Sequence, residues 1–542
     1  MKIYLIVLFF FLSHTAYIAQ ICSSEKKCKI DKDKIRKHLE ILGSDLFEGR
    51  GTGTKGGALA ANYIATEFKK IELKPVGEDS TYFQNVPLHG TTVLDNSKLI
   101  FFSSLDTLQL SLREDYILAN SGEQTIIPSA IGLVFVGFGI IAPEYDHNDY
   151  LEKDVTGKIV VMLNGEPESN SNGFFRGDEP TIYSYPDVKH RIAIGRGAAG
   201  TIIIPQIRLD DEKAWHHLVN EYSFEDVKLP YTASENFSII LNPNIAKQLF
   251  VSGKIHPNSV LNCNLFSTSG CTLEFEGEFF QRDFKAQNVV GVIEAKKNIN
   301  NEFVIISAHY DHLGIGPTIN NDKIYNGVLD NAIGVSTLLE VARVLQKNQE
   351  NLKRSILFIA TTGEEKGLLG SSYYVDHPIV PLYKTVANIN IDGAAYLDDF
   401  NSVIGIGAEL SDLEKYLENT ANKSQVKVSE IPKEFYSYEA FNRSDQIAFA
   451  KAGIPSLLLL DAPDYANLRY DEAINKIINY DSKIYHTPFD DLSTNINYGA
   501  TAKHAEIIAL LIYNIATSKD KINWEKNVPY NYIRLQTLAE KR

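Results

Sequence analysis

Apolar residues near the start of this chain recur at the spacing of an α-helix in two segments. The positions are Ile35, Leu39 and Leu42 in the first segment, and Ala60, Ile64, Phe68 and Ile71 in the second. A glycine-rich stretch, residues 49–57, separates them. It has neither the preceding strand nor the Lys-Ser/Thr pair of a nucleotide-binding loop, so we interpret it as a turn. The pattern therefore predicts two helices joined by a turn.

The sequence pattern changes between about residues 99 and 280, where short apolar runs are interrupted by Gly, Pro and Asn. Runs typical of strands occur at 133–138, 158–163, 200–205 and 271–279. No cluster of metal-ligand type follows any of them. The histidines of this region, His147, His190, His216 and His217, have no acidic or cysteine partner at useful spacing, so we expect them to be surface or structural residues. The region is predicted to be a separate, mainly β domain.

From residue 288 onward, apolar runs alternate with segments of helical periodicity. The predicted strands are 289–294, 303–308, 355–360, 386–391 and 456–460, and the predicted helices include 331–346 and 502–515. Alternation of this kind is typical of an α/β sheet covered by helices.

The first twenty residues have the composition of a targeting segment. Met1 and Lys2 give a weakly positive start, an apolar run covers residues 3–12, and the small residues Ser13, Ala16 and Ala19 follow. The run is too short to span a bilayer. We therefore expect a signal peptide over residues 1–20, and a mature protein exported to the periplasm or the medium without stable membrane insertion.

Charge and cysteine content narrow the possible partners. The 542 residues carry a net charge of -15 and contain no basic run with interleaved aromatic residues. An acidic surface repels a phosphate backbone, so nucleic acid is not expected as a partner. In an exported protein, Cys22 with Cys28 and Cys263 with Cys271 could each close a short disulfide loop, or all four could be free thiols.

Acidic and histidine side chains collect where the predicted strands of the last region end. His309, Glu364, Glu365 and Asp392 follow strands, Asp330 precedes the long predicted helix, and His486 lies in a later loop. In open α/β sheets, ligand-binding groups gather beyond the carboxyl ends of the strands. Any one of these residues alone has an ordinary explanation, such as a helix cap or a solvated turn. Their joint placement, which the middle region lacks, favours a metal site.

Imidazole and carboxylate without thiolate suit zinc, with manganese or cobalt as substitutes. Five of these side chains could hold two ions that share one bridging carboxylate, and Glu364 would stay free for proton transfer. Two ions about 3.5 to 4 Å apart would lower the pKa of a water between them and polarise a scissile carbonyl. Asp311 follows His309 by two residues and could orient its imidazole. The pattern predicts a two-metal hydrolase.

Around these residues the chain closely resembles the co-catalytic zinc peptidases of family M28, which include secreted bacterial aminopeptidases. The matching stretches are His-Tyr-Asp-His-Leu-Gly at 309–314, Leu-Asp-Asn-Ala-x-Gly at 329–334, Gly-Glu-Glu-x-Gly-Leu-Leu-Gly-Ser at 363–371, Asn-Ile-Asp at 390–392 and His-Thr-Pro at 486–488. The resemblance implies two Zn2+ per chain. The implied ligands are His309 and Asp392 for one ion, Glu365 and His486 for the other, and Asp330 as the bridge between them. It also implies Glu364 as the general base, Asp311 as the partner of His309, and a cis peptide bond after Asp330.

The middle region resembles a protease-associated domain in three stretches, at 136–140, 154–160 and 197–203. The expected fold class is α/β, a mixed β-sheet flanked by helices of the zinc-exopeptidase type, with an inserted mainly β protease-associated domain. The expected organisation is a signal peptide at 1–20, an N-terminal part of the peptidase domain at 30–98, the insert at 99–280, the catalytic domain at 281–520 and a C-terminal tail at 521–542.

The function that the resemblance implies is a secreted exopeptidase that hydrolyses N-terminal residues from peptide substrates. A carboxypeptidase or dipeptidase of the same family is the alternative, because the same metal chemistry could perform either reaction. A pocket acid for a free α-amine, or a basic group for a carboxylate, would discriminate between them. Retention of all five ligands and of Glu364 disfavours a non-enzymatic binding protein and a single-zinc glutaminyl cyclase.

One position departs from the family pattern. After Arg443-Ser444-Asp445 this chain has Gln446, where relatives often have histidine. The ligand pattern is intact without it. Arg443, Asp445 and Gln446 are therefore candidates for the substrate pocket.

Overall fold

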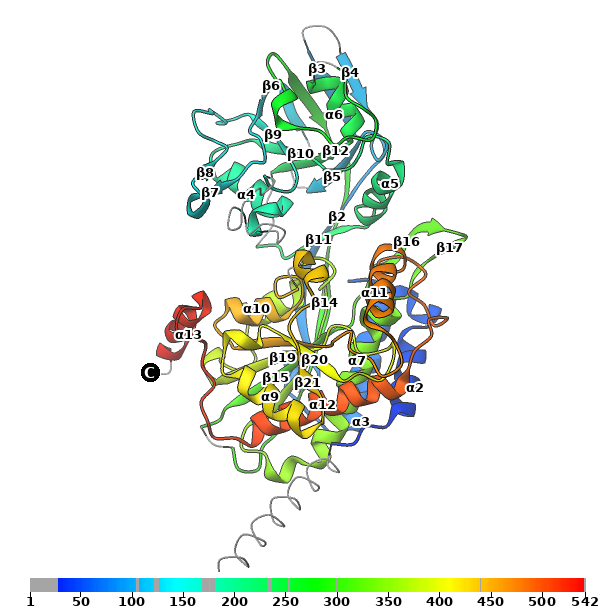
Figure 1. Ribbon diagram of the computed structural model, residues 1–542, viewed down its shortest axis with the longest axis vertical. Helices are drawn as coiled ribbons and strands as arrows, with labels where there is room; N and C mark the ends of the chain where they lie inside the picture. The colour runs from blue at the N-terminus through cyan, green and yellow to red at the C-terminus, as the bar shows by residue number, and fades with distance from the viewer. Residues whose placement is uncertain are drawn as a thin grey trace, which may run out of the picture. The chain divides into compact units, whose positions relative to one another are not determined.

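The computed structural model describes residues 28–103, 107–120, 126–167, 175, 181–231, 236–251, 254–298, 300–438 and 440–540. The expected signal peptide and Cys22 lie outside these residues. The chain divides into two compact units, whose elements are labelled in Figure 1. The first unit comprises Met1–Pro87, Lys285–Pro432 and Ala440–Arg542, and the second comprises Leu88–Phe284 and Lys433–Glu439.

A mixed β-sheet forms the centre of the first unit. Its four parallel neighbours are, in spatial order, β18 (Ser355–Thr361), β15 (Phe303–His309), β19 (Thr385–Asn390) and β22 (Ser456–Asp461). Two antiparallel strands flank them: β14 (Phe279–Ile293) lies beside β18, and β20 (Ser402–Ile406) lies beside β22. The strand β21 (Lys427–Val428) follows β20 and is parallel to it. The short β1 (Lys74–Pro75) pairs with β14, and β14 also neighbours β2 (Phe83–Val93), which continues into the second unit to pair with β11 (Asp226–Lys228). The predicted fold class, a mixed α/β sheet, is confirmed.

Alternate side chains of the central strands serve two different cores, which is why these strands are continuous apolar runs. On β15, Val304 and Ile306 belong to the core formed with the helices α2 (Lys32–Leu42), α3 (Lys55–Lys70), α7 (Ile333–Lys347) and α12 (Tyr498–Thr517). Ile305, between them, packs on the other face with side chains of α8 (Leu369–Asp376) and α10 (Gln446–Lys451). Helices therefore cover both faces of the sheet (Figure 1).

Two helices open the first unit, as the periodicity predicted. Asp31 caps α2 by accepting a hydrogen bond from the Asp33 amide, and Thr54 caps α3 in the same way with Gly57. The long helix begins at Ile333 rather than at the predicted residue 331. It starts later because Asp330 and Asn331 have non-helical backbone angles, and a cis peptide bond joins them.

The second unit contains an eight-stranded sheet in the spatial order β4 (Thr107–Leu110), β3 (Lys98–Phe102), β13 (Thr272–Glu276), β6 (Ile126–Phe135), β9 (Ile159–Leu163), β10 (Gly200–Ile204), β12 (Phe237–Leu241) and β5 (Tyr116–Asn120). Three helices accompany it: α4 (Pro186–Gly195), α5 (Glu212–Glu221) and α6 (Pro243–Phe250). The unit includes the whole predicted insert, residues 99–280. Its assignment as a protease-associated domain stays a prediction.

His147, for which the sequence indicated no acidic partner, has one in the structure. His147 Nε2 lies 3.1 Å from Asp149 Oδ1, while the other carboxylate oxygen of Asp149 accepts the amides of Phe138 and Ile140. His190 is buried, and its Nδ1 lies 2.8 Å from the Thr201 hydroxyl. These contacts hold turns and strands in place, so both histidines have structural partners.

Two further regions complete the description. Residues 521–542, expected as a tail, contain the helix α13 (Pro529–Ala539), and the buried Trp524 donates a hydrogen bond to the Gly453 carbonyl at 2.9 Å. Cys263 and Cys271 are free thiols, and burial raises the pKa of Cys263 to about 11. None of the described helices has both the length and the apolar character needed to cross a bilayer.

We expect the buried imidazole of His504, on α12, to make the first unit sensitive to acid. Its Nδ1 accepts the Ala395 amide at 3.2 Å, and burial lowers its pKa to about 4. Since the unfolded chain takes up this proton near pH 6.5 and the folded chain only near 4, stability is lost as the pH falls through that window, by about 3 kcal/mol at most. Urea unfolding of metal-free protein at pH 7.5 and pH 5 should show this loss in the wild type.

The matched variant is His504→Asn, whose amide oxygen can accept the same amide but does not titrate. The free energy of unfolding of the wild type relative to this variant should fall between pH 7.5 and pH 5. If the two proteins respond to pH in parallel, His504 is not the responsible group.

Candidate metal centre

The parallel strands bring the predicted acidic and histidine residues to one edge of the sheet. His309 is the last residue of β15, Glu364 and Glu365 lie in the turn after β18, and Asp392 lies two residues beyond β19. These three strands are direct neighbours, so their carboxyl ends meet. Asp330 comes from the segment before α7, and His486 from the connection between α11 (Tyr470–Lys483) and α12.

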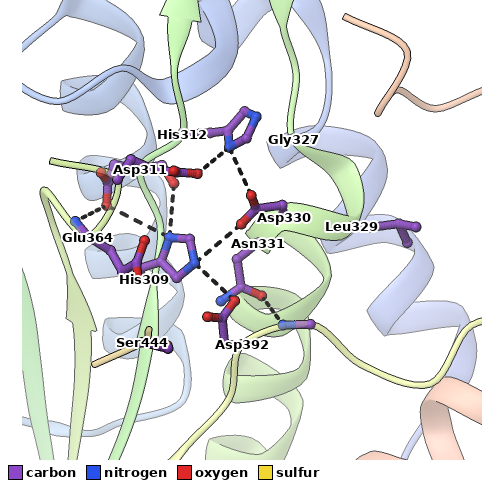
Figure 2. A network of polar contacts seen from close by, with 12 residues as sticks. His309, Asp311, His312, Gly327, Leu329, Asp330, Asn331, Glu364, Asp392 and Ser444 are labelled. Atoms are coloured by element: carbon purple, nitrogen blue, oxygen red, sulfur yellow. Dashed lines mark hydrogen bonds and ion pairs between the residues drawn. The ribbon is translucent and has the colours of Figure 1, made fainter. Parts of the chain in front are cut away.

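Four contacts among the predicted residues form two pairs around Asp330. His309 Nε2 lies 3.1 Å from Asp392 Oδ1 and 3.4 Å from Asp330 Oδ1, as Figure 2 shows. His486 Nε2 lies 3.1 Å from Glu365 Oε2 and 3.3 Å from Asp330 Oδ2. Each oxygen of Asp330 therefore faces a different pair of histidine and carboxylate.

These spacings fit a pair of zinc ions. Ligand atoms that each lie about 2.0 to 2.1 Å from a tetrahedral zinc are roughly 3.3 Å apart, and the four distances lie between 3.1 and 3.4 Å. Asp330 Oδ2 and His486 Nε2 are buried and face each other, yet neither makes a well-directed hydrogen bond to another described residue. Buried acceptors that converge without donors are what a cation would satisfy.

The cluster is closed on one side and open on the other. His309 and Glu365 are 1% and 4% exposed, whereas Asp392 and His486 are 25% and 21% exposed. A catalytic metal site keeps a position accessible to substrate, in contrast to a fully enclosed structural site. The open side allows a substrate to approach the shared ligands.

Glu364 lies beside both pairs. One of its carboxylate oxygens is within 4.8 Å of the donor atoms of His309 and Glu365. Burial raises the pKa of Glu364 well above its usual range, against the lowering effect of His309, and the neighbouring carboxylates of Asp392 and Glu365 raise it further. A carboxylate with a raised pKa is suited to accepting and returning a proton near neutral pH.

Asp311 contacts His309, but through its main-chain carbonyl rather than through the predicted carboxylate. The nearest acceptor to His309 Nδ1 is the Asp311 main-chain carbonyl at 3.2 Å, while the carboxylate lies 3.9 Å away. That carboxylate accepts the Glu364 amide at 3.1 Å and the Thr52 hydroxyl at 2.9 Å. Burial raises the pKa of Asp311 to about 6. The residue thus links His309 to the turn that carries Glu364.

Asn331 links the loops of two candidate ligands. Its side-chain amide donates to the Ile391 carbonyl at 2.9 Å, and its side-chain oxygen accepts the Gly393 amide at 2.9 Å. These are the two chain neighbours of Asp392. Because Asn331 is the chain neighbour of Asp330, these hydrogen bonds connect Asp330 to the loop of Asp392 (Figure 2).

Three important residues were not assigned from the sequence. His312 is fully buried, and its Nδ1 lies 2.6 Å from Glu365 Oε1. Asp490 accepts the Leu329 and Asp330 amides at 2.9 and 3.0 Å. The third, Arg50, lies in the glycine-rich stretch interpreted only as a turn. The signals were that His312 lies within the family-like stretch 309–314 and that Asp490 follows His486 by four residues.

Arg50 holds the segment before Asp330 from the opposite side to Asp490. Its guanidinium is buried and donates to the main-chain carbonyls of Tyr310, Leu42, Asn326 and Gly327 at 2.5 to 2.9 Å. Burial lowers the pKa of Arg50 to about 10, a value at which it still carries its charge at neutral pH. Arg50 donates to carbonyls of residues 326 and 327, and Asp490 accepts from the amides of residues 329 and 330. The main chain around Asp330 is therefore held at both of these points.

We expect Arg50→Met to destabilise the protein by about 3 to 5 kcal/mol, because four buried carbonyls lose a charged donor and nearby carboxylates lose their counter-charge. Arg50→Lys should recover only part of this, since an ammonium cannot match the planar fork of the guanidinium. Urea unfolding gives the values. Arg36→Met is the control: Arg36 is 60% exposed and paired with Glu40 on one helix, so its loss should leave the free energy of unfolding nearly unchanged. Equal effects of Arg50→Met and Arg36→Met would contradict the role of Arg50 in holding the segment before Asp330.

The three substrate-pocket candidates occupy different environments. Asp445 is fully buried and accepts the hydroxyls of Thr361 and Ser371, both at 2.5 Å. Gln446 is equally buried: its amide donates to the Ala440 and Phe441 carbonyls, and its oxygen accepts from Asn390. This geometry favours a supporting role for both residues.

Arg443 is exposed and lies close enough to Tyr485 for its charge to act on that phenol. Burial raises the pKa of Tyr485 well above its usual range, and Arg443 opposes that shift. The Tyr485 ring stacks on His486 with the ring centroids 3.8 Å apart. Of the three candidates, Arg443 is therefore the one that can reach a substrate, and its role stays a prediction.

An α/β sheet with carboxylate and imidazole groups gathered at the carboxyl ends of its parallel strands has side chains that could hold metal ions. Residues 288–512 match the model of Peptidase family M28. Over this segment the match agrees with the family that the sequence resembles.

Two curated relatives are similar over this part of the chain. Aminopeptidase YwaD of Bacillus subtilis is 28% identical over 237 residues, which cover 44% of this chain and 46% of the relative. The probable leucine aminopeptidase 2 of Aspergillus oryzae is 28% identical over 246 residues, 43% of this chain and 45% of the relative. The chain thus spans about half the length of these relatives.

A solved structure extends the likeness in fold to most of the chain. The aminopeptidase from Aneurinibacillus sp. strain AM-1 superposes with a TM-score of 0.56 over 92% of this chain and 97% of its own, at 19% identity.

Proposed function

We propose that this protein is a two-zinc exopeptidase that removes N-terminal residues from peptides. The observation that carries the proposal is the geometry of Asp330, whose two oxygens face two separate pairs of histidine and carboxylate at 3.3 and 3.4 Å. Two relatives with the name aminopeptidase support the choice of reaction.

The proposed ligands are those whose spacing fits zinc. His309 and Asp392 hold one ion, Glu365 and His486 hold the other, and Asp330 is shared. When bound, the two ions polarise the scissile carbonyl as Lewis acids and lower the pKa of the attacking water. His486, in the second pair of ligands, is partly exposed, so a substrate could approach this part of the site.

Glu364 acts as the general base in this proposal. Its carboxylate takes the proton from the attacking water and returns it to the leaving amine, so it has to stay outside the ligand set. Its raised pKa and its position beside both pairs support this role. Asp311 fixes the Glu364 backbone and the His309 ring at the same time.

The rest of the chain fits an exported enzyme. We propose that residues 1–20 are a signal peptide, that residues 99–280 form a protease-associated domain, and that the protein works in the periplasm or the medium on peptides. The net charge of -15 supports exclusion of nucleic acid as a partner.

Carboxypeptidase or dipeptidase action is the second candidate, and Arg443 is the observation that favours it. An exposed guanidinium near the Tyr485–His486 stack offers a partner for a substrate carboxylate. The same metal chemistry would then act at the other end of a peptide.

A peptide panel distinguishes these activities. Zinc-loaded mature protein is given peptides with a free or acetylated N-terminus and a free or amidated C-terminus, and released amino acids are measured. We expect acetylation to abolish cleavage and amidation to leave it unchanged. Loss on amidation alone would establish the carboxypeptidase, and no cleavage of any peptide would overturn the proposal. A Glu364→Gln preparation controls for contaminating peptidases.

A further inference from the structure

We infer that His312 is a positioning residue of the second zinc site: its Nδ1–H donates to Glu365 Oε1, which leaves Oε2 as the single oxygen that faces His486 and the ion. The inference rests on the proposed function, because it takes Glu365 and His486 as ligands. It gives a task to a buried histidine that belongs neither to the five ligands nor to the base.

The two oxygens of Glu365 have different histidine neighbours. His312 Nδ1 lies 2.6 Å from Oε1, whereas His486 Nε2 lies 3.1 Å from Oε2. The first distance is that of a short, charge-assisted hydrogen bond. The second is close to the roughly 3.3 Å expected for two atoms bound to one tetrahedral zinc. One carboxylate oxygen of Glu365 therefore accepts a hydrogen bond, and the other is placed as a metal ligand.

His312 could instead be a fourth ligand, because its Nδ1 is within 4.8 Å of donor atoms of Asp330, Glu365 and His486. The 2.6 Å contact opposes that role, because at this distance Nδ1 and Glu365 Oε1 are too close to sit at separate corners of a zinc tetrahedron.

The other ring nitrogen of His312 supplies a further argument. Nε2 is buried and has no hydrogen-bond partner among the residues that the structure describes. If Nδ1 bound a metal, the ring proton would sit on Nε2 and a buried N–H would be left without an acceptor. With the proton on Nδ1, the orphaned atom is only a lone pair, and the donor is used on Glu365.

The surroundings fix the ring so that it can perform this task. A Cβ added at Gly327 would lie 2.4 Å from His312 Cγ, so the ring packs directly on the Gly327 backbone. Its edge contacts the His486 ring, with the centroids 5.6 Å apart and the planes at 66°. Arg50 donates a hydrogen bond to the Gly327 carbonyl. The residue that fixes the segment before Asp330 therefore also fixes the backbone against which His312 packs.

His312→Leu and His312→Asn separate the hydrogen bond from packing. Leucine fills the space without a donor, and the asparagine amide can donate from near the position of Nδ1. Zinc per chain is measured after equilibration with graded chelator, together with kcat and KM. We expect the leucine variant to release one of its two zinc ions at about 10- to 100-fold lower chelator concentration, and asparagine to restore most of that affinity.

A control is available for general effects of removing a buried imidazole. His504 is as buried as His312 and lies in the same unit, but it bonds to the Ala395 amide. His504→Leu should lower stability while both zinc ions keep their affinity at pH 7.5. If His312→Leu fails to fold, the comparison of His312→Asn with His312→Gln remains, because glutamine places its amide nearer to Nε2 and should not restore the affinity.

The outcomes separate this inference from the proposed function. Wild-type protein that binds fewer than two zinc ions, or Glu365→Gln that binds zinc as tightly as wild type, overturns the proposed function itself. Wild type with two ions and a His312→Leu variant of unchanged zinc affinity overturns only the role of His312. Equal weakening by leucine and asparagine makes His312 a ligand, and also overturns the inference.

Discussion

Replacing Glu364 by glutamine is expected to lower kcat by about 100- to 10,000-fold, because the isosteric amide cannot accept the proton of the attacking water. The zinc content should stay at two ions per chain, since Glu364 is not among the proposed ligands. Steady-state kinetics on the best peptide of the panel, with zinc in excess, give kcat, and metal analysis of the same sample gives the stoichiometry.

The metal analysis matters because Glu364 also lies within 4.8 Å of donor atoms of His309 and Glu365. A variant that loses both activity and one zinc ion would make Glu364 a ligand, and a variant with kcat within tenfold of wild type would place the base elsewhere. Glu350→Gln is the matched control. Glu350 is an exposed carboxylate paired with Lys296, and its replacement should leave kcat unchanged.

The edge of the sheet that carries the site could be predicted because parallel strands buried on both faces are continuous apolar runs. The first polar residues after such runs lie at the carboxyl edge, and this predicted the place of His309, Glu364, Glu365 and Asp392. Asp330 and His486 could be added only as loop residues, since neither ends a strand, and the resemblance implied their roles.

The supports of the site could not be predicted in this way, because they depend on contacts between distant parts of the chain. Arg50 donates to carbonyls 260 to 277 positions away, and nothing in a glycine-rich turn indicates a buried guanidinium. His312 presents the same difficulty at short range. Its distance along the chain from His309 is fixed by sequence, but its position against Glu365 depends on how Gly327 and the segment before Asp330 fold over it.

In the second unit the strands were easier to predict than the helices. The apolar runs at 158–163 and 200–205 correspond to β9 and β10. The helices α4 and α5 went unassigned, although Pro186 at the first position of α4 and the Asp211 cap of α5 are start signals. Both helices bury few apolar side chains, and the apolar periodicity of α4 is weak.

Asp330→Asn is expected to weaken both zinc ions together and to lower kcat/KM by at least about 1,000-fold, because the Lewis acidity of each ion contributes several kcal/mol to the transition state. The amide nitrogen cannot replace the carboxylate oxygen that faces the second histidine. Asp392→Asn should weaken only the ion at His309. Metal analysis against graded chelator compares the two variants, and an Asp330→Asn protein that keeps one ion at wild-type affinity would contradict the bridge.

The same substitution should lower stability more with metal than without. In metal-free protein it removes a carboxylate that lies 3.4 Å from His309 Nε2 and 3.3 Å from His486 Nε2. Against the lowering effect of burial, the surrounding carboxylates raise the pKa of both imidazoles well above their usual range, so Asp330 faces charged partners. The metal-free variant should therefore unfold at a somewhat lower temperature than wild type. With zinc, wild type gains stability through binding and the variant does not, so the difference between the two Tm values should widen. A difference that is the same with and without zinc would mean that Asp330 supports the fold rather than the ions.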